Sequence, residues 1–138
     1  MNKTFYLELI TPERSFFKGE VEMLVVGTED GEMGILADHM PIAAIVKTGS
    51  IRFLTDGVWR EAANSEGFLE IRPDETVLLA QTLEWPEEIE INRVRERIEE
   101  SEEQLRQAKN LQEYRLSKAA LARAVARLKV RSHYNKEI

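Results

Sequence analysis

The chain changes its hydrophobic periodicity once along its length, near Pro86, and this change restricts the folds that it can adopt. Up to about Leu83, apolar and polar side chains follow a period of two, as in Phe5–Ile10. After Pro86, apolar residues recur every three or four positions. The first pattern is typical of strands and the second of helices. The sequence therefore predicts two domains, a β-domain in residues 1–84 and a helical domain in residues 85–138.

Short turn-forming sequences divide the β-domain into segments of strand length. Thr11-Pro12, Asp56-Gly57 and Pro73-Asp74 are three of them. Asp and Gly tolerate positive φ, so Asp56-Gly57 predicts a two-residue hairpin with a type I′ turn. Many short strands separated by turns are typical of an antiparallel β-sandwich or a flattened barrel. We expect one of these architectures for the N-terminal domain.

Two helices are predicted in the C-terminal domain. The first has a stripe that contains Ser101 and five apolar residues, Ile91, Val94, Ile98, Leu105 and Ala108. The second runs roughly over residues 112–133, and its stripe comprises Tyr114, Ser117, Leu121, Val125 and Leu128. We place the break at residues 109–111, because Asn110 accepts the left-handed conformation that ends helices. Helices joined by so short a loop are antiparallel neighbours, which predicts a two-helix hairpin.

Charge is distributed unevenly over this predicted hairpin. Residues 84–103 carry nine acidic and three basic side chains, whereas residues 106–138 carry nine basic and two acidic ones. Antiparallel pairing places the acidic start of the first helix beside the basic end of the second, and each block suits the dipole of its own helix. Two interpretations stay open. The charges only stabilise the hairpin, or a narrow alanine-rich seam holds the hairpin weakly enough for it to open as a switch.

Composition excludes several classes of function. A formal net charge of −6 argues against general nucleic-acid binding, which needs an excess of cations facing phosphate. The absence of cysteine excludes disulfides, zinc–thiolate sites and cysteine nucleophiles. The N-terminus lacks a signal-peptide pattern, and no apolar run reaches the roughly 20 residues that span a bilayer. We expect a cytoplasmic protein without direct membrane insertion, whose link to any membrane goes through a partner.

Catalytic groups are sparse in the sequence. The two histidines, His39 and His133, are too few and too far apart for a histidine-based metal or catalytic site. The glycine-containing stretch Gly27–Gly34 carries three acidic residues and no lysine, so it would repel phosphate. We therefore expect no catalytic residues, no metal site and no enzymatic activity of the chain on its own.

The stretch from Gly31 to Pro41 is the most informative motif. It resembles the G-x-x-G-I-L-x-x-H-x-P signature of the epsilon subunit of bacterial rotary ATP synthases. Thr11–Arg14, Gly67–Ile71 and the alanine-rich stretch Arg123–Leu128 are also similar to that family's pattern. Their order and spacing extend the resemblance over nearly the whole chain.

The resemblance implies a non-catalytic subunit of the central stalk. In the family, the sandwich packs on the gamma subunit and contacts the membrane c-ring, so the complex lies peripherally on the cytoplasmic face of the cell membrane. The position that matches the c-ring contact is Glu32, where a carboxylate would give orientation more than affinity. The loop that contains His39 and Met40 is expected to contact partners as well, since Met suits adaptable interfaces. Composition alone leaves a core position for Met40 as the alternative. The alternative is an unrelated sandwich-plus-hairpin adaptor that binds another protein.

The resemblance also implies a regulatory hairpin. In related bacterial subunits the hairpin can extend along gamma into the catalytic head, formed by the alpha and beta subunits, and block the rotation that hydrolyses ATP. Arg123, Arg127 and Arg131 are spaced by four residues and so share one helical face. On extension, this face could meet acidic surface on the head.

Some relatives bind ATP through a motif Ile/Leu-Asp-x-x-Arg-Ala together with arginines of the second helix. Here the matching residues are Ile89, Glu90, Arg93 and Val94, with Glu90 in place of Asp and Val94 in place of Ala. Arg123 and Arg127 would supply a phosphate clamp. ATP is therefore expected as a regulatory ligand and not as a required cofactor. The competing interpretation is that Glu90 and Arg93 only link the hairpin to the sandwich.

Overall fold

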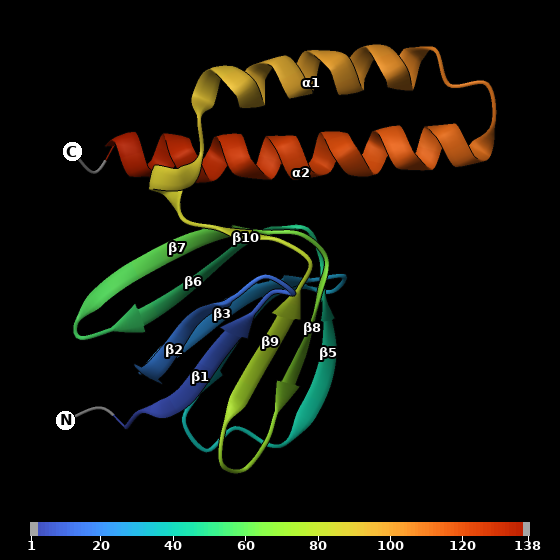
Figure 1. Ribbon diagram of the computed structural model, residues 1–138. Coiled ribbons are helices and arrows are strands. Elements are labelled where there is room, and N and C mark those ends of the chain that lie inside the picture. The colour runs from blue at the N-terminus through green and yellow to red at the C-terminus, as the bar shows by residue number, and fades with distance from the viewer. Residues whose placement is uncertain (1–2, 137–138) are drawn as a thin grey trace.

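The computed structural model describes residues 3–136, which form a β-sandwich followed by two long helices (Figure 1). This arrangement confirms the predicted fold class. The sandwich contains ten strands in two five-stranded sheets. Their bounds are β1 Phe5–Ile10, β2 Ser15–Val21, β3 Met23–Thr28, β4 Gly31–Leu36, β5 Ile42–Val46, β6 Gly49–Thr55, β7 Val58–Asn64, β8 Gly67–Ile71, β9 Thr76–Ala80 and β10 Leu83–Glu84.

The two sheets have the strand orders β2-β1-β9-β8-β5 and β10-β7-β6-β3-β4. Most neighbours are antiparallel, as the hairpin turns require. β1 and β9 instead run parallel, with Leu7 opposite Thr76 and Ile10 opposite Leu79. Parallel neighbours need a long connection, and here β2 to β8 lie between them in the chain.

The turn between β6 and β7 has the predicted geometry. Thr55 faces Val58 across a two-residue loop, and Asp56 and Gly57 have φ values of 52° and 75°. Both central residues are left-handed, as a type I′ turn requires. Asp-Gly is one of the few pairs that adopt this conformation at low steric cost, which is why this hairpin could be predicted from two residues.

The core lies between the two sheets and is formed by the inward-facing side chains of both. Leu7, Leu9, Ile51, Phe53 and Leu78 are completely buried. They alternate with more exposed residues along β1 and β6, which is the period-two pattern of the sequence. Burial of this apolar area is the main source of the sandwich's stability.

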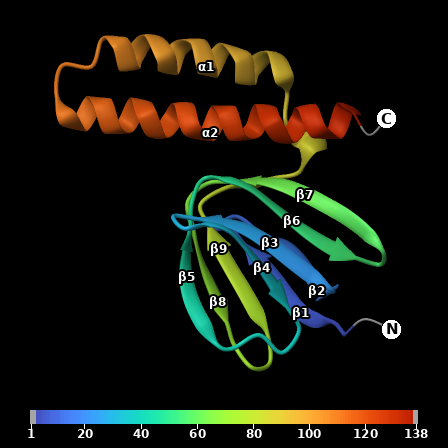
Figure 2. The ribbon, with the colours of Figure 1, turned by 180° about the vertical axis from the view of Figure 1, so that it is seen from behind.

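A one-turn 3₁₀ helix, Pro86–Glu88, connects the sandwich to α1 (Ile91–Arg106) and α2 (Leu111–Lys136). The two helices are antiparallel, and α2 lies between α1 and the sandwich in both views (Figures 1 and 2). In α1, Val94 and Ser101 are buried and Ile91, Ile98 and Leu105 are half-buried, which confirms the predicted stripe up to Leu105. Ala108 was predicted to continue the stripe, but it lies beyond the end of the helix at Arg106. The hairpin therefore attaches to the sandwich mainly through α2.

Two details of the predicted hairpin are wrong. Asn110 does not end α1 in a left-handed conformation, because within residues 3–136 only Asp38 and Asp56 are non-glycine residues with positive φ. Its side-chain oxygen instead accepts the backbone N–H of Glu113 at 2.9 Å and caps the start of α2. Tyr114 is 43% exposed and does not belong to the buried stripe of α2. Within residues 111–134 of α2, the buried side chains are those of Ser117, Ala124, Ala126 and Val130.

Candidate functional site

The linker between the two domains is held to the sandwich by aromatic packing. The ring of Trp85 stacks on Phe16, with ring centroids 4.1 Å apart. The guanidinium of Arg60 lies 4.0 Å from the centroid of the Trp85 ring, within the range of a cation–π interaction. The linker is therefore fixed on the sandwich up to this tryptophan.

Glu88 extends this attachment by one turn. Arg14 Nη2 donates to both carboxylate oxygens of Glu88 at 2.9 Å, and the backbone N–H of Trp85 donates to Oε1 at 2.9 Å. Partial burial by itself would raise the pKa of Glu88, but the hydrogen bonds from Trp85 and Arg14 and the charge of Arg14 outweigh it and lower the pKa. The 3₁₀ turn thus belongs structurally to the sandwich.

A small apolar cluster and an ion pair hold α2 on the sandwich. Ala63 of β7 packs with Val94 and Val130 from the two helices, together with Ile89 of the linker. Beside this cluster, Arg127 Nε lies 2.7 Å from Glu84 Oε1, and Arg127 Nη2 donates to Glu84 Oε2 at 3.1 Å. Nearer the end of α2, Arg131 donates to the Pro86 carbonyl and His133 contacts Glu61, so the attachment consists of one small apolar cluster and a few polar contacts.

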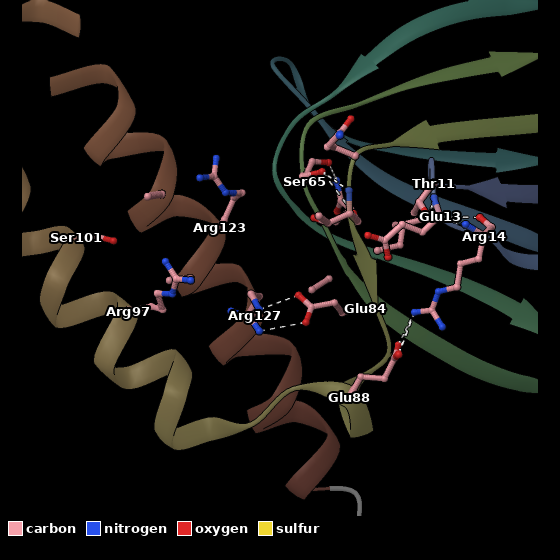
Figure 3. Close-up of a pocket in the computed structure, with 17 residues that line it drawn as sticks. Thr11, Glu13, Arg14, Ser65, Glu84, Glu88, Arg97, Ser101, Arg123 and Arg127 are labelled. Atoms are coloured by element: carbon pink, nitrogen blue, oxygen red, sulfur yellow. Dashed lines mark hydrogen bonds and ion pairs between the residues drawn. The ribbon is translucent and has the colours of Figure 1, made fainter. Parts of the chain in front are cut away.

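Next to this attachment lies a groove of about 740 Å³ between the sandwich and the hairpin, which we call the interdomain groove (Figure 3). Arg97, Arg123 and Arg127 line it from the helices. Thr11, Arg14 and Ser65 from loops of the sandwich, Glu84 of β10 and Glu88 of the linker line the other side. The helical side of the groove is therefore cationic, while the other side is polar and mixed in charge.

Several polar groups of the interdomain groove lack partners. Among the described residues, Arg97 and Arg123 form no ion pair. Asn64 is 2% exposed; its Nδ2 donates to two backbone carbonyls, but its Oδ1 has no hydrogen-bond partner. Two free guanidinium groups and a buried acceptor suit a ligand that carries both anionic oxygens and N–H or O–H donors.

A second surface lies on the outer face of the other sheet. Ile10, Leu79, Phe68 and Ile45 face one another in register across β1, β9, β8 and β5, and we call this set the apolar row. Leu79, Phe68 and Ile45 are 47%, 40% and 54% exposed. Clustered exposed apolar side chains of this kind mark contact surfaces for other proteins.

Neither a metal centre nor a membrane helix is found in the part of the chain that the structure describes. Within it, no three His, Cys, Asp or Glu side chains gather in a way that could hold a metal ion. No helix among residues 3–136 combines the length and the apolar composition needed to cross a membrane.

Comparison with known families accounts for both domains. Residues 4–86 match the family described as "ATP synthase, Delta/Epsilon chain, beta-sandwich domain". Residues 87–131 match "ATP synthase, Delta/Epsilon chain, long alpha-helix domain". The chain belongs to the ATP synthase delta/epsilon family. It is a subunit of that enzyme and not a catalytic one, and the alternative of an unrelated adaptor is excluded.

Curated relatives of this delta/epsilon chain are similar over nearly their full length. The ATP synthase epsilon chain of Caldanaerobacter subterraneus is 47% identical over 135 residues, which are 97% of this chain and 98% of the relative. That of Ruminiclostridium cellulolyticum is 48% identical over 125 residues, covering 91% and 93% of the two chains. The predicted identity as an epsilon-type subunit is confirmed.

Solved structures share the fold at low identity. A chain of the mitochondrial ATP synthase of Euglena gracilis, in an assembly of OSCP, F1 and c-ring, has a TM-score of 0.76 at 20% identity; the match covers 86% of this chain and 76% of that one. A chain from the central stalk and c-ring of the Tetrahymena thermophila mitochondrial enzyme has a TM-score of 0.65 at 10% identity, with coverage of 94% and 98%.

The residues predicted to bind ATP lie in three different places in this delta/epsilon chain. Arg123 and Arg127 line the interdomain groove. Ile89 and Val94 are 2% and 0% exposed in the apolar cluster, so their side chains are closed to a ligand. Glu90 and Arg93 are exposed, lie 3.5 Å apart as an ion pair, and do not line the groove.

Sequence reasoning missed Arg97 and Asn64, which complete the interdomain groove. Arg97 lies one helical turn after Arg93, and a search for basic residues four positions on from the motif would have found it. Asn64 carries no comparable signal, because its position depends on how β7 ends beside the hairpin.

The residues predicted to contact partners lie at opposite ends of β4. Glu32, near the β3–β4 turn, pairs with Arg52 at 3.1 Å and lines a groove beside His133. His39 lies beyond the other end of β4 and lines a separate hollow. Its Nδ1 lies 2.8 Å from the Met40 carbonyl oxygen, and Met40 is 74% exposed. The structure therefore does not bring Glu32 together with His39 and Met40.

Proposed function

We propose that this chain couples the gamma subunit to the c-ring in the central stalk, on the cytoplasmic face of the cell membrane, and that its hairpin restrains ATP hydrolysis by the alpha/beta head. Membership of the delta/epsilon family carries the proposal. The two similar structures come from ATP synthase assemblies that contain the c-ring, one of them a complex of central stalk and c-ring, and this supports the same partners.

The apolar row is the surface that we assign to gamma. It offers exposed side chains from three adjacent strands, on the sheet that does not carry the hairpin.

A charge introduced into the apolar row tests this assignment. Placing a carboxylate there by Phe68→Glu would leave a charge buried and unpaired in the interface. We expect this variant to lose co-purification with gamma. Trp59→Glu, on the other sheet and similarly exposed at 48%, is the matched control and should retain it. Equal retention by both variants would contradict the assignment.

Glu32 is the residue that we assign to the c-ring. Its side chain is 72% exposed on β4, an edge strand. In the assembled enzyme, Glu32→Cys should crosslink to the ring. Asp56→Cys, in the exposed turn at the opposite end of the same sheet, should not. The chain contains no other cysteine that would confuse the result.

Restraint of hydrolysis is assigned to the hairpin because its attachment to the sandwich is small. A helix pair held by a few contacts can leave one surface for another at modest cost. Ending the chain after Glu88 removes both helices but keeps the contacts of Trp85 and Glu88 with the sandwich. The assembled enzyme with this truncated chain should hydrolyse ATP faster than the enzyme with the full chain. Unchanged hydrolysis would remove this role from the hairpin.

ATP is proposed as the ligand of the interdomain groove. The free guanidinium groups of Arg97 and Arg123 suit its phosphates, and the buried Asn64 Oδ1 suits a donor on the base or ribose. A ligand that contacts both domains would favour the docked hairpin by mass action.

Calorimetric titration tests the ATP proposal directly. Arg123→Ala should weaken ATP binding about tenfold or more, the loss expected for a charge-assisted contact to phosphate. Arg115→Ala is the control, because Arg115 is exposed on the same helix and does not line the groove. If the unmodified chain releases or takes up no heat on titration with ATP to millimolar concentration, the ATP proposal is wrong.

A further inference from the structure

A second groove, separate from the interdomain groove, lies at the C-terminal end of α2. It has a volume of about 590 Å³, and we call it the end groove. The end of α2 contributes His133 and Tyr134, and the sandwich and linker contribute both tryptophans of the chain, Trp59 and Trp85. None of its residues is used by the ATP proposal.

One polar contact joins α2 to the sandwich in the end groove. His133 Nδ1 lies 2.9 Å from Glu61 Oε1 of β7. The Glu61 side chain is only 17% exposed, less than any other carboxylate in the ion pairs of the described residues. A carboxylate withdrawn from water to this extent needs a counter-charge or hydrogen bonds in compensation.

The other charged groups of the end groove do not supply that counter-charge fully. Arg52 of β6 faces Glu61 in register, but its guanidinium pairs with Glu32 at 3.1 Å. The guanidinium of Arg60, on β7, lies over the Trp85 ring. From the linker, Glu87 adds a third carboxylate. With a neutral histidine, the groove therefore holds three carboxylates against two guanidinium groups.

Among the side chains that the structure describes, Arg131 of α2 brings one further charge beside this groove. Arg131 of α2 lies over the Tyr134 ring, 5.4 Å from its centroid, and its Nη1 donates to the Pro86 carbonyl at 3.5 Å. At the start of α1, Glu90 and Arg93 pair with each other and do not line the groove. Among the described side chains of α2, His133 is the one that contacts Glu61 directly.

We propose that His133 is a proton-controlled latch for the hairpin. When the imidazole is protonated, it forms an ion pair with the largely buried carboxylate of Glu61, which favours docking of α2. Histidine side chains change charge between about pH 5 and 8, so docking weakens as the pH rises through this range. The latch concerns the docking equilibrium of the chain alone. Only its consequence for hydrolysis rests on the proposed function.

Docking can be measured on the full chain by energy transfer between dyes. Exposed Glu66 and Lys118 can be replaced by cysteines, and the chain has no others. Urea titrations at about pH 5.5 and about pH 8 then give the docking equilibrium constant at each pH. We expect the constant to fall about two- to fivefold from the lower to the higher pH, the range for a partly exposed ion pair.

Three variants decide the origin of this dependence. His133→Gln should abolish it, and His133→Arg should hold the hairpin docked at the higher pH. His39→Gln removes the other histidine, at the far end of the sandwich, and should leave the dependence as in the unmodified chain. The proposal is overturned if the unmodified chain shows no pH dependence, or if His133→Gln retains it. If the sandwich unfolds together with the hairpin, the same comparison applies to their common midpoint.

Discussion

The two carboxylates on either side of Trp85 form ion pairs with different parts of the molecule. Glu84 pairs with Arg127 and holds α2, whereas Glu88 pairs with Arg14 and holds the linker on the sandwich. When the hairpin leaves, the first pair must break, but the second can remain. The point of detachment is therefore set by which residue each carboxylate contacts.

Glu84→Gln should loosen the hairpin. Arg127 would keep its position but lose its counter-charge, and both side chains of this pair are less than one-third exposed. We expect a loss of about 1.5–3 kcal/mol in the free energy of docking, the scale for a hydrogen bond to a charged group. Urea titration of energy transfer between dyes at positions 66 and 118 measures this docking free energy. Glu100→Gln, an exposed position on α1, is the control and should change this free energy by less than about 0.5 kcal/mol.

The free energy of unfolding should depend on pH in the acidic range because of Glu88. Because its pKa is lowered in the folded chain, its contribution is present above the range where glutamates ordinarily titrate. That contribution is lost as the pH falls through the lowered pKa. Urea unfolding at a series of acidic pH values should therefore show a smaller loss of stability for Glu88→Gln than for the unmodified chain. An identical acid dependence of the two proteins would contradict the role given to this carboxylate.

The sequence could predict part of the candidate site at this scale. Arg123 and Arg127 could be identified because helical spacing places them on one face. Ile89 and Val94 could not be excluded, because a motif in the sequence does not reveal which of its side chains will pack against β7 and α2. Their burial depends on contacts between segments far apart in the chain.

At the scale of elements, α2 is the component that connects the other parts. It packs against α1 on one side and against β6 and β7 on the other. Its buried residues Ser117, Ala124 and Ala126 are small, so the helices approach closely but bury little apolar area. Val130 is the largest side chain of α2 that is completely buried, and much of the attachment depends on it.

Val130→Ala should therefore weaken docking more than an average substitution on this helix. Removing two buried methyl groups costs about 1–3 kcal/mol, depending on how far the cluster collapses. Hydrogen exchange of the α2 amides and energy transfer in urea should both report easier opening. Val58→Ala, at a 60% exposed position on β7, is the control and should have little effect.

The elements themselves were predictable where local chemistry decides them. The β6–β7 turn follows from Asp56-Gly57, and the stripe of α1 follows from its spacing. The function of Asn110 could not be predicted, because asparagine can either end one helix or cap the start of the next. The hydrogen bond from the Glu113 N–H to its side chain shows that it caps α2.

At the scale of the whole molecule, a β-sandwich carries the exposed apolar row and the exposed Glu32, together with a two-helix arm that is attached mainly through α2. Periodicity predicted the sandwich and the arm but not the strand order, because the parallel pairing of β1 with β9 joins segments separated by most of the domain. Nor could periodicity predict that α2, and not α1, lies on the sandwich, since both helices have an apolar stripe.

Locking α2 on the sandwich tests most directly whether the hairpin must leave it to restrain hydrolysis. Ala63 and Val130 pack in one cluster, so Ala63→Cys with Val130→Cys would bond β7 to α2 on oxidation. The natural chain has no cysteine, so its enzyme, oxidised in the same way, is the control. In the assembled enzyme, the oxidised double variant should hydrolyse ATP as fast as the enzyme with the chain ending at Glu88, and reduction should restore the slower rate. If hydrolysis stays restrained while the disulfide is formed, the hairpin does not act by leaving the sandwich.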